Sequence, residues 1–497
     1  MFRKILVANR GEIAVRIVRA LREMSIRSVA VFSEVDRRAL HVQMADEAVC
    51  IGPGASTESY LSIPRILKAV RETGAEAIHP GYGFLSENAA FAKACEDAGI
   101  KFIGPSWQAI ERMGSKTAAR RLAIEVGAPV VPGTQQGIRD AAEARKTAAN
   151  IGYPVLLKAA AGGGGKGMRR VDNERELESA IRGASSEAER AFGSGEVYLE
   201  KFIERPRHIE VQVLGDEHGH LIHLGERECS IQRRHQKVVE ESPSPLVLKK
   251  PELRENIGQA ALRIARAANY SNAGTLEFLA DQAGNFYFLE MNTRLQVEHP
   301  VTEWVTGLDL VHWQIRIAAG ERLTVQQEDV RWKGSAMECR VYAEDPDNNY
   351  FPSPGEITYY AEPSGAGVRV DGGAYTGWTV PIEYDPLLAK LTVWAENRHT
   401  AIARMRRALS EYRVLGITTN LSLFDALMND EQFVAGSLHT GFLDDFKQRA
   451  RNSTTHQEQV LASILVAAGM QHEAPTASPS TGKESMWRSS GRRGLLR

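Results

Sequence analysis

The sequence predicts a multidomain protein of mixed α/β and α+β class that begins with a parallel sheet. Short apolar runs alternate with helical stretches through residues 1–112, an order typical of a parallel sheet with helices on both faces. Alternating strands, a glycine-rich loop and an antiparallel hairpin follow, which is an α+β pattern. A chain of 497 residues is long enough for about two to four domains.

The first 112 residues contain four well-marked strands. A buried strand is predicted at Lys4–Ala8, and the helix after it runs through Glu23. The next strands are predicted at Ser28–Phe32, Ala77–His79 and Lys101–Gly104. The first turn lacks the GxGxxG fingerprint, so a dinucleotide site there, as in a nicotinamide dehydrogenase, has little support.

The middle of the chain, residues 113–332, is predicted to be α+β. Its strands are predicted at Val155–Ala159, Val197–Phe202, His208–Val213 and His220–Leu224, before a hairpin within Thr275–Glu298. Residues 333–446 return to strands and turns, with a strand at Ala389–Trp394 and helices from about Thr400. The segment 447–497 is rich in Ser, Pro, Thr and Gly and is predicted to be a disordered tail.

Composition excludes several function classes. The 61 basic residues balance 62 acidic ones, so the net charge of the chain gives no argument for binding to nucleic acid or to membrane surfaces. No apolar run approaches the roughly 18 residues of a membrane span. The four cysteines form no CxxC pair, which argues against a zinc site or disulfide framework and favours reduced thiols. With a strand pattern starting at the N-terminus instead of a signal peptide, we expect a cytoplasmic protein.

The hairpin around Gln282–Asn285 carries the clearest chemical signal. Folding it about the Ala283–Gly284 bond places Glu277 opposite Glu290, and two facing carboxylates repel each other. A divalent cation would turn this repulsion into a binding site, because hard cations prefer carboxylate oxygens. Asn292 and Arg294 extend the same face at period two. A solvated charged face is the plainer interpretation of a generic hairpin.

A glycine loop lies between Lys158 and Lys166. It fails the Walker A test, because Lys166 is followed by Gly and the chain continues as strand. Backbone N–H groups of such a hairpin can still close over phosphates, and Lys158 at the end of the preceding strand is placed to meet phosphate charge. A flexible turn is the alternative.

Two further segments are candidates for nucleotide contacts. Glu228–Lys237 packs four cationic or potentially cationic groups into five positions, which favours an oligoanion pocket over a solvated basic stretch. Glu200–Ile203 at a strand end offers polar backbone and an apolar side chain, which would suit an adenine base. His208, seen alone, is more often a satisfied structural histidine than a ligand-binding residue.

These pieces, in this order, resemble the ATP-grasp biotin carboxylases from Met1 to about Phe446. The motifs that carry the resemblance are Ala8–Ala14, His79–Asn88, Gly225–Lys237 and Glu290–Pro300. The resemblance implies a Rossmann-like (pre-ATP-grasp) N-terminal domain at 1–112 and an ATP-grasp domain at 113–332 with a glycine-rich lid at about 131–204. It also implies an α+β C-terminal domain at 333–446. Ala161 departs from the family, whose lid often has glycine there, and the segment near Leu438-His439 matches poorly.

The same resemblance assigns roles residue by residue. The ATP contacts it implies are Lys116, Lys158, Gly163, Gly164, Gly165, Lys201, His208, Gln232 and His235, with Glu200 and Ile203 at the adenine. Glu277, Glu290 and Asn292 would hold Mg²⁺ or Mn²⁺, at two sites. Bicarbonate would lie among Lys237, Arg294, Gln296, Val297 and Glu298, and the biotin ring near Arg340 and Tyr82. Lys237, Arg294, Glu298 and Arg340 would be the catalytic set.

The implied activity is that of a ligase that carboxylates biotin with ATP and bicarbonate, through carboxyphosphate. The context expected is the first half-reaction of acetyl-CoA carboxylase in fatty-acid biosynthesis; the alternative is the same step for pyruvate or propionyl-CoA carboxylase. Another ATP-grasp ligase would lack the Arg294…Glu298 and Arg340 set, and a non-catalytic scaffold would be expected to lose the metal carboxylates. None of the 11 methionines is followed by lysine, so we expect biotin on a separate carrier protein. The other implied partners are a carboxyltransferase and a second copy of the chain, with neither nucleic acid nor membrane.

Overall fold

The computed structural model describes residues 1–134, 137–138, 141–159, 168–234 and 236–449. Residues Met1–Leu443 form one compact unit, and a second begins at Asp444. The predicted lid glycines Gly163–Gly165, the predicted ATP contact His235 and the tail from residue 450 lie outside the described residues. In the part of the chain that is described, no helix is long and apolar enough to cross a membrane.

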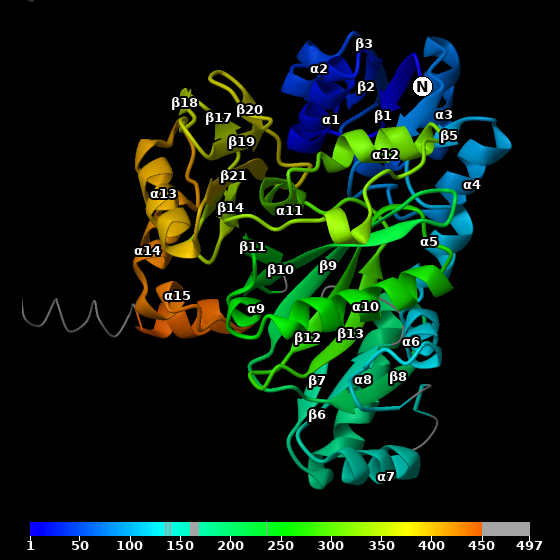
Figure 1. The fold of residues 1–497 in the computed structure, drawn as a ribbon, viewed down its shortest axis with the longest axis vertical. Helices are drawn as coiled ribbons and strands as arrows, with labels where there is room; N and C mark the ends of the chain where they lie inside the picture. The colour runs from blue at the N-terminus through cyan, green and yellow to red at the C-terminus, as the bar shows by residue number, and fades with distance from the viewer. Residues whose placement is uncertain (135–136, 139–140, 160–167, 235, 450–497) are drawn as a thin grey trace, which may run out of the picture. The chain divides into compact units, whose positions relative to one another are not determined.

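The N-terminal region is a five-stranded parallel sheet in the order β3-β2-β1-β4-β5 (Figure 1). Its strands are β1 (Lys4–Val7), β2 (Arg27–Ser33), β3 (Glu47–Gly52), β4 (Ala77–His79) and β5 (Lys101–Phe102). Its helices are α1 (Gly11–Glu23), α2 (Leu40–Met44), α3 (Ile63–Thr73) and α4 (Ala89–Asp97). β1 and the interior of β2 are buried almost throughout, because helices cover both faces of the sheet. The predicted parallel sheet is confirmed, and the ends of its four predicted strands shift by at most two residues. Its fifth strand, β3, was not predicted from the sequence.

The centre of the molecule is an eight-stranded antiparallel sheet in the order β13-β12-β9-β10-β11-β14-β21-β19. Its strands are β9 (Arg207–Gly215), β10 (Leu221–Arg233), β11 (Gln236–Ser242), β12 (Asn272–Ala280), β13 (Phe286–Asn292), β14 (Ser335–Tyr342), β19 (Val368–Gly372) and β21 (Leu387–Ala395). The pairing of β11 with β14 carries the hydrogen-bonded ladder across residue 332, where the sequence predicts a domain boundary. Side chains from both sides of that boundary can therefore meet on one continuous face.

Helices on this sheet complete the two main cores. They are α5 (Trp107–Gly114), α6 (Lys116–Glu125), α9 (Pro245–Lys249), α10 (Glu252–Ala267), α11 (His299–Thr306) and α12 (Leu310–Ala318). The apolar stripe of α10 packs on β9 and β10, with Ile257 and Ile264 fully buried. α12 joins the sheet to the N-terminal region, because its apolar residues share one core with those of α1.

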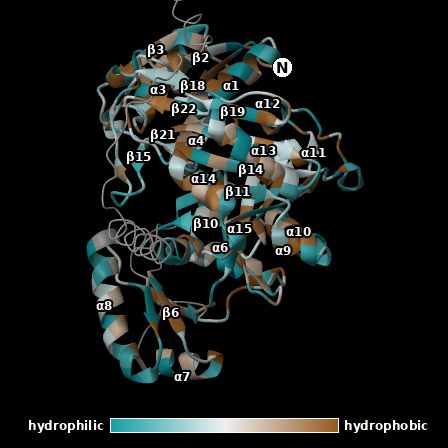
Figure 2. Cartoon of the chain, turned by 90° about the vertical axis from the view of Figure 1, so that its left-hand side faces the viewer, coloured by the Kyte–Doolittle hydropathy of each residue, from teal (hydrophilic) through white to brown (hydrophobic). Residues whose placement is uncertain are grey.

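A smaller module between Val155 and Lys201 carries three antiparallel strands in the order β7-β6-β8. They are β6 (Val155–Ala159), β7 (Arg169–Val171) and β8 (Val197–Lys201), covered by α7 (Ala141–Ile151) and α8 (Glu174–Phe192). Figure 2 shows hydrophilic residues along α8, as expected for a helix with one solvated face. Asn173 caps the start of α8, and Gly193 ends it in the left-handed conformation.

The remaining described elements surround β14, β19 and β21. Three two-stranded ribbons are β15 (Glu344–Asp345) with β16 (Phe351–Pro352), β17 (Gly355–Glu356) with β20 (Thr379–Val380), and β18 (Tyr359–Ala361) with β22 (Arg413–Leu415). The helices are α13 (Arg398–Glu411), α14 (Leu421–Asn429) and α15 (Glu431–Val434).

β10 is the main local difference from the sequence prediction. The sequence predicts a strand at His220–Leu224, but β10 continues to Arg233 and is buried for nearly its whole length. The sequence does not predict this extension, because its interior residues, such as Arg227 and Glu228, are polar. They are buried with charged partners on neighbouring strands, so no apolar alternation marks the strand.

Candidate active site

The site is built on a row of paired residues that crosses four strands. Arg227 on β10 lies opposite Glu210 on β9, Glu210 opposite Glu277 on β12, and Glu277 opposite Glu290 on β13. Directly opposed residues of antiparallel strands project to the same side. Three neighbouring carboxylates therefore share one face, and they need positive charge among them.

The predicted pairing of Glu277 with Glu290 is present, but it depends on a β-bulge. Nearer the turn, Phe278 pairs with Phe288, and at that register Glu277 would face Leu289. Leu289 is left without a partner, so the register shifts by one residue and Glu290 faces Glu277. Glu290 is 36% exposed at its side chain, and its ion pair is a 3.5 Å contact with Lys116.

Lys237 is the central cation of the site. Its Nζ donates to Glu277 Oε1 at 2.9 Å, to Glu298 Oε1 at 2.7 Å and to Glu210 Oε2. Burial alone would lower the pKa of Lys237, but these three carboxylates outweigh it and hold the pKa well above its usual value. The lysine is therefore a fixed positive charge.

Glu298 connects Lys237 to Arg340. Its Oε2 accepts from Arg340 Nη2 at 2.8 Å, while Arg340 Nε donates to Glu240 Oε1 at 2.6 Å. Burial would raise the pKa of Glu298, yet Lys237 and Arg340 hold it well below its usual range. Glu298 is therefore an ionised carboxylate between two cations.

Arg294 is oriented by a residue from the N-terminal region. Its Nε donates to Glu87 Oε2 at 2.8 Å, and the other oxygen of Glu87 accepts from the backbone N–H of Thr293 at 2.8 Å. Arg294 also donates to Gln296 Oε1 at 2.7 Å and to Asn292 Oδ1 at 3.2 Å. The guanidinium group is thus held on the same side as the carboxylate and amide oxygens that are candidate metal ligands.

Asn292 and His208 complete the surroundings of Glu277. Asn292 Nδ2 donates to Glu277 Oε1 at 2.9 Å, and His208 Nε2 lies 3.1 Å from Glu277 Oε2. Burial would lower the pKa of His208, but Glu277 raises it above its usual value. His208, Glu210 and Glu277 bring possible ligand atoms within 4.8 Å of one another, whereas Glu290 is not part of that cluster.

The residues present fit a divalent cation. Glu290 is partly exposed, with one long ion pair, and Glu277 faces it with an oxygen already held by Asn292. Carboxylate and amide oxygens are the donors that Mg²⁺ and Mn²⁺ prefer. Lys237 and Lys116 form ion pairs with Glu277 and Glu290 and balance part of their negative charge.

The predicted nucleotide contacts lie around β6 and β8. Lys158 Nζ donates to Glu200 Oε2 at 2.6 Å, and Arg120 Nη1 donates to Glu200 Oε1 at 2.9 Å. Lys201 is turned toward its own module, donating to the carbonyls of Gly152 and Tyr153 at 2.9 Å each.

A small cavity of about 20 Å³ opens beside these residues. It is lined by Lys116, Thr117, Arg120, Thr134, Tyr198, Glu200, Phe288 and Leu289. Lys116, which lines the cavity, also contacts Glu290, so the cavity adjoins the Glu277–Glu290 pair.

The other predicted residues are placed as follows. Gln232 donates to the carbonyl of Cys229 at 2.8 Å, Gln296 is buried, and the carbonyl of Val297 accepts from Lys390 at 2.9 Å. Ile203 is half-buried.

Tyr82, predicted at the biotin ring, donates its hydroxyl to Glu12. Its ring lies 6.0 Å from Lys390 Nζ. Burial and the Glu12 carboxylate raise its pKa well above the usual value, so the phenol is a neutral donor.

Several residues of the site were not identified from the sequence. Glu210 could have been found, because it lies two positions after His208 on a predicted strand and so shares its face. Glu87 lies inside a motif that the sequence marks only as a loop. Arg227 and Glu240 had no local signal, because only the pairing of distant strands brings them to the site.

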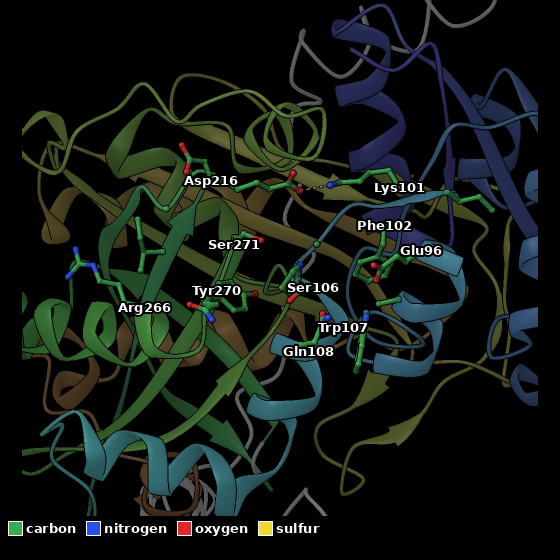
Figure 3. Close-up of a pocket in the computed structure, with 18 residues that line it drawn as sticks. Glu96, Lys101, Phe102, Ser106, Trp107, Gln108, Asp216, Arg266, Tyr270 and Ser271 are labelled. Carbon is green, nitrogen blue, oxygen red and sulfur yellow. Dashed lines mark hydrogen bonds and ion pairs between the residues drawn. The ribbon is translucent and has the colours of Figure 1, made fainter. Parts of the chain in front are cut away.

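A larger cavity, of about 670 Å³, lies away from this chemistry (Figure 3). It opens between the β5–α5 segment, the turn after β9 and the end of α10, with Trp107, Arg266 and Tyr270 among its walls. An ion pair between Lys101 and Glu217 bridges it. None of the carboxylates or cations described above lines it, so the buried charge network, and not the roomier cavity, marks the candidate site.

Three family descriptions match successive parts of the chain. "Biotin carboxylase, N-terminal domain" matches residues 1–110, "Carbamoyl-phosphate synthase L chain, ATP binding domain" matches 115–326, and "Biotin carboxylase C-terminal domain" matches 338–445. Together they cover most of the sequence.

Named relatives agree with these matches. A pyruvate carboxylase subunit of Methanothermobacter thermautotrophicus is 54% identical over 90% of this chain and 91% of its own length. Biotin carboxylase 1 of Bacillus subtilis is 53% identical over 90% of this chain and 99% of its own. Among solved structures, biotin carboxylase from Campylobacter jejuni in a β,γ-ATP complex is 47% identical, covers 90% of this chain and 99% of its own, and superimposes with a TM-score of 0.86.

A second solved structure carries ligands of the expected kinds. The biotin carboxylase domain dimer of Hydrogenobacter thermophilus 2-oxoglutarate carboxylase was solved with MgADP, ADP and bicarbonate. It is 51% identical, covers 90% of this chain and 98% of its own, and has a TM-score of 0.84. The expected fold, with its N-terminal parallel sheet, central ATP-grasp domain and C-terminal domain, is confirmed.

Proposed function

The chain belongs to the biotin carboxylase family, and from this premise we propose how its residues carry out ATP- and bicarbonate-dependent carboxylation of biotin. The enzyme is an ATP-dependent ligase that uses ATP, a divalent cation and bicarbonate. The observation that carries the residue assignment is the convergence of Lys237 and Arg340 on the buried carboxylate of Glu298, beside the Glu277–Glu290 pair. Buried cations around one carboxylate suit an anionic substrate that must also lose a proton.

Bicarbonate would bind between Arg294 and the cations that contact Glu298. Lys237 and Arg294 offer N–H donors to its oxygens, and Gln296 and the backbone at Val297 would close the site. Glu298 is a weak base while both cations contact it, since its pKa is held low. A bound anion draws Lys237 and Arg340 toward itself, which returns basicity to Glu298 and lets it take the bicarbonate proton.

The deprotonated bicarbonate oxygen then attacks the γ-phosphoryl group of ATP and releases ADP. Lys116 and Lys158 would contact the nucleotide phosphates, in exchange for their ion pairs with Glu290 and Glu200. A divalent cation held by Glu277, Glu290 and Asn292 would neutralise phosphate charge. Gly163–Gly165 and His235 are proposed as further ATP contacts, as are Lys201, His208, Gln232 and Ile203.

In the second stage, carboxyphosphate breaks down to CO₂ and phosphate, and the phosphate takes the N1 proton of biotin. Arg340 would stabilise the biotin enolate with a charge-assisted hydrogen bond, and Tyr82 would lie against the ring. CO₂ then adds to N1. Exclusion of water during this step protects the short-lived intermediate.

The direct test measures phosphate release from ATP in the presence of bicarbonate, with and without free biotin. The proposal expects release that requires bicarbonate and rises with biotin, together with formation of carboxybiotin. ATP cleavage that ignores both would contradict it and favour another ATP-grasp ligase.

The partners are a further proposal. We infer that biotin reaches the site on a carrier protein and that a carboxyltransferase consumes the product, since none of the 11 methionines precedes a lysine that could carry biotin in a Met-Lys-Met motif. A homodimer is proposed by analogy with the Hydrogenobacter domain dimer. Light scattering of the purified chain tests the dimer, and streptavidin blotting tests the absence of covalent biotin.

The final carboxyl acceptor stays a prediction. Acetyl-CoA is the expected acceptor, and the Methanothermobacter relative, which is named for pyruvate carboxylase, makes pyruvate the second candidate. Purification of the native complex, with acetyl-CoA, propionyl-CoA and pyruvate compared as acceptors, distinguishes them.

A further inference from the structure

Two carboxylates that the mechanism above does not use lie directly behind Arg340. Glu240 on β11 faces Glu338 on β14 in the antiparallel ladder, and neither side chain is exposed to solvent. Facing residues of such a pair hold their Cβ atoms about 5 Å apart, so their carboxyl groups can meet. Two ionised carboxylates at this distance repel strongly in a buried site.

The hydrogen bonds of the pair leave one oxygen on each side without a partner. Glu240 Oε1 accepts from Arg340 Nε at 2.6 Å, and Glu338 Oε2 accepts from the Thr392 hydroxyl at 3.1 Å. Among the described residues, Glu240 Oε2 and Glu338 Oε1 have no hydrogen-bond partner. Both unpaired oxygens belong to residues that face each other, so one proton between them would satisfy both.

The charged groups around the pair do not neutralise Glu338. The titratable side chains that face it or adjoin it are Lys237 on β11, Cys339 and Arg340 on β14, Lys390 on β21 and Glu298 at the start of α11. Lys237 and Arg340 are bound to other carboxylates.

Lys390 is the nearest remaining cation, and it is also engaged. Its Nζ donates to the carbonyl of Val297 at 2.9 Å and lies 3.2 Å from Glu12 Oε1 and 3.8 Å from Asp371 Oδ2. Within the described residues, no lysine or arginine forms an ion pair with Glu338. An ionised carboxylate without a cation at this depth is strongly disfavoured, so the neutral acid is the stable form.

We propose that Glu240 and Glu338 share a single proton at neutral pH, with neutral Glu338 donating to Glu240, and that this acid pair positions Arg340 for the biotin step. Glu240 is then a single carboxylate fixed on two sides, by Arg340 Nε and by the Glu338 acid. The guanidinium plane is held so that its Nη2 edge points to Glu298 and the substrate. Glu338 acts through Glu240 and Arg340 and does not touch the substrate.

The electrostatics agree with this arrangement. Burial raises the pKa of Glu240 to about 7 despite the neighbouring Arg340 cation, and burial raises the pKa of Glu338 well above its usual value. Loss of the shared proton at alkaline pH would place a second negative charge behind Arg340. That charge would weaken the field offered to the anionic bicarbonate and to the biotin enolate.

The first test detects the proton itself and does not depend on activity. Infrared difference spectra between the wild type and Glu338→Gln at neutral pH should show loss of a protonated-carboxyl C=O band that shifts in D₂O. Glu76→Gln is the matched control, because hydrogen bonds from Arg3 lower the pKa of the half-buried Glu76, and removal of an ionised group leaves this band in place. If Glu338→Gln removes only carboxylate absorption, Glu338 is ionised and the proposal is wrong.

The second test is kinetic and rests on the proposed function. Glu338→Gln keeps a donor toward Glu240 at every pH, so it should retain turnover near pH 7 and lose the wild type's rise of the bicarbonate KM between about pH 7 and pH 9. Glu338→Ala removes the donor and leaves Arg340 poorly held, which should lower carboxybiotin formation by about tenfold or more while bicarbonate-dependent ATP cleavage persists.

The two variants separate positioning from a merely structural role. Rescue by Gln relative to Ala, with a flattened alkaline limb, supports the proposal; equal loss in Gln and Ala, or an unchanged alkaline limb in Gln, overturns it. A wild type without biotin-dependent activity would contradict the proposed function alone, because the infrared band would still report the shared proton.

Discussion

Replacement of Lys237 by methionine should destabilise the protein in a way that depends on pH. Met keeps the apolar stem and removes the Nζ that contacts Glu210, Glu277 and Glu298. All three carboxylates are buried, with exposures of 0%, 5% and 0%. Removing one partner of a buried ion pair costs about 3–5 kcal/mol, because the remaining charge stays desolvated.

The size of the melting shift follows from the length of the folded unit. Unfolding entropy is about 2 cal/mol/K per residue, so the 443 residues of Met1–Leu443 correspond to about 0.9 kcal/mol/K. A loss of about 3–5 kcal/mol then lowers the Tm by about 3–6 °C at pH 7. Lys93→Met, on an exposed pair with Asp97, is the control and should show no measurable shift.

The pH dependence has a definite sign. In the wild type, Lys237 and other cations hold the pKa values of Glu277 and Glu298 below their unfolded values, so these groups stabilise the fold above about pH 4.3 and lose that effect as pH falls. In Lys237→Met, burial without this cation should raise the same pKa values. The orphaned carboxylates then bind protons as pH falls, and the deficit relative to the wild type shrinks.

Calorimetry at one scan rate, at pH 7 and at pH 5.5, measures this difference. The deficit of Lys237→Met should be clearly smaller at pH 5.5. An equal deficit at both pH values would mean that the variant loses packing rather than charge compensation, and the ion-network account of Lys237 would be wrong.

Three further variants test individual roles. Glu290→Gln should weaken Mg·ATP binding and lower turnover severely at limiting Mg²⁺, while the metal-free fold becomes no less stable because a cross-strand repulsion is removed; unchanged turnover at limiting Mg²⁺ would contradict the metal assignment. Glu298→Ala should lose bicarbonate-dependent ATP cleavage, whereas Arg340→Ala should lose carboxybiotin formation and keep some uncoupled cleavage; identical failure in both assays would refute the division of labour. Glu87→Gln should raise the bicarbonate KM by about tenfold with the ATP KM unchanged, because Arg294 loses its ionic anchor; a parallel rise of both KM values would argue for a general disruption.

Much of the fold could be predicted because its signals are local. The apolar runs at Lys4–Val7 and Ala77–His79 mark parallel strands, and the hairpin turn places Glu277 opposite Glu290. The predicted pairing of Glu277 with Glu290 is correct, but it depends on the bulge at Leu289, which has no signature in the sequence. The sequence predicts only the first part of β10, because the buried residues in the rest of the strand are polar.

The amino-acid sequence alone specifies which residue types are available for the chemistry. These are the carboxylate pair of the hairpin, the arginine four residues before Glu298, and the basic stretch that ends at Lys237. Tertiary structure decided which charges meet. Glu87, Glu210 and Glu240 reach the site only when β9, β11 and the N-terminal region pack together, and the pairing of β11 with β14 brings Arg340 to Glu240. The physical reason is that a buried charge is stable only beside its partner, and here the partners are up to about two hundred residues away in the chain.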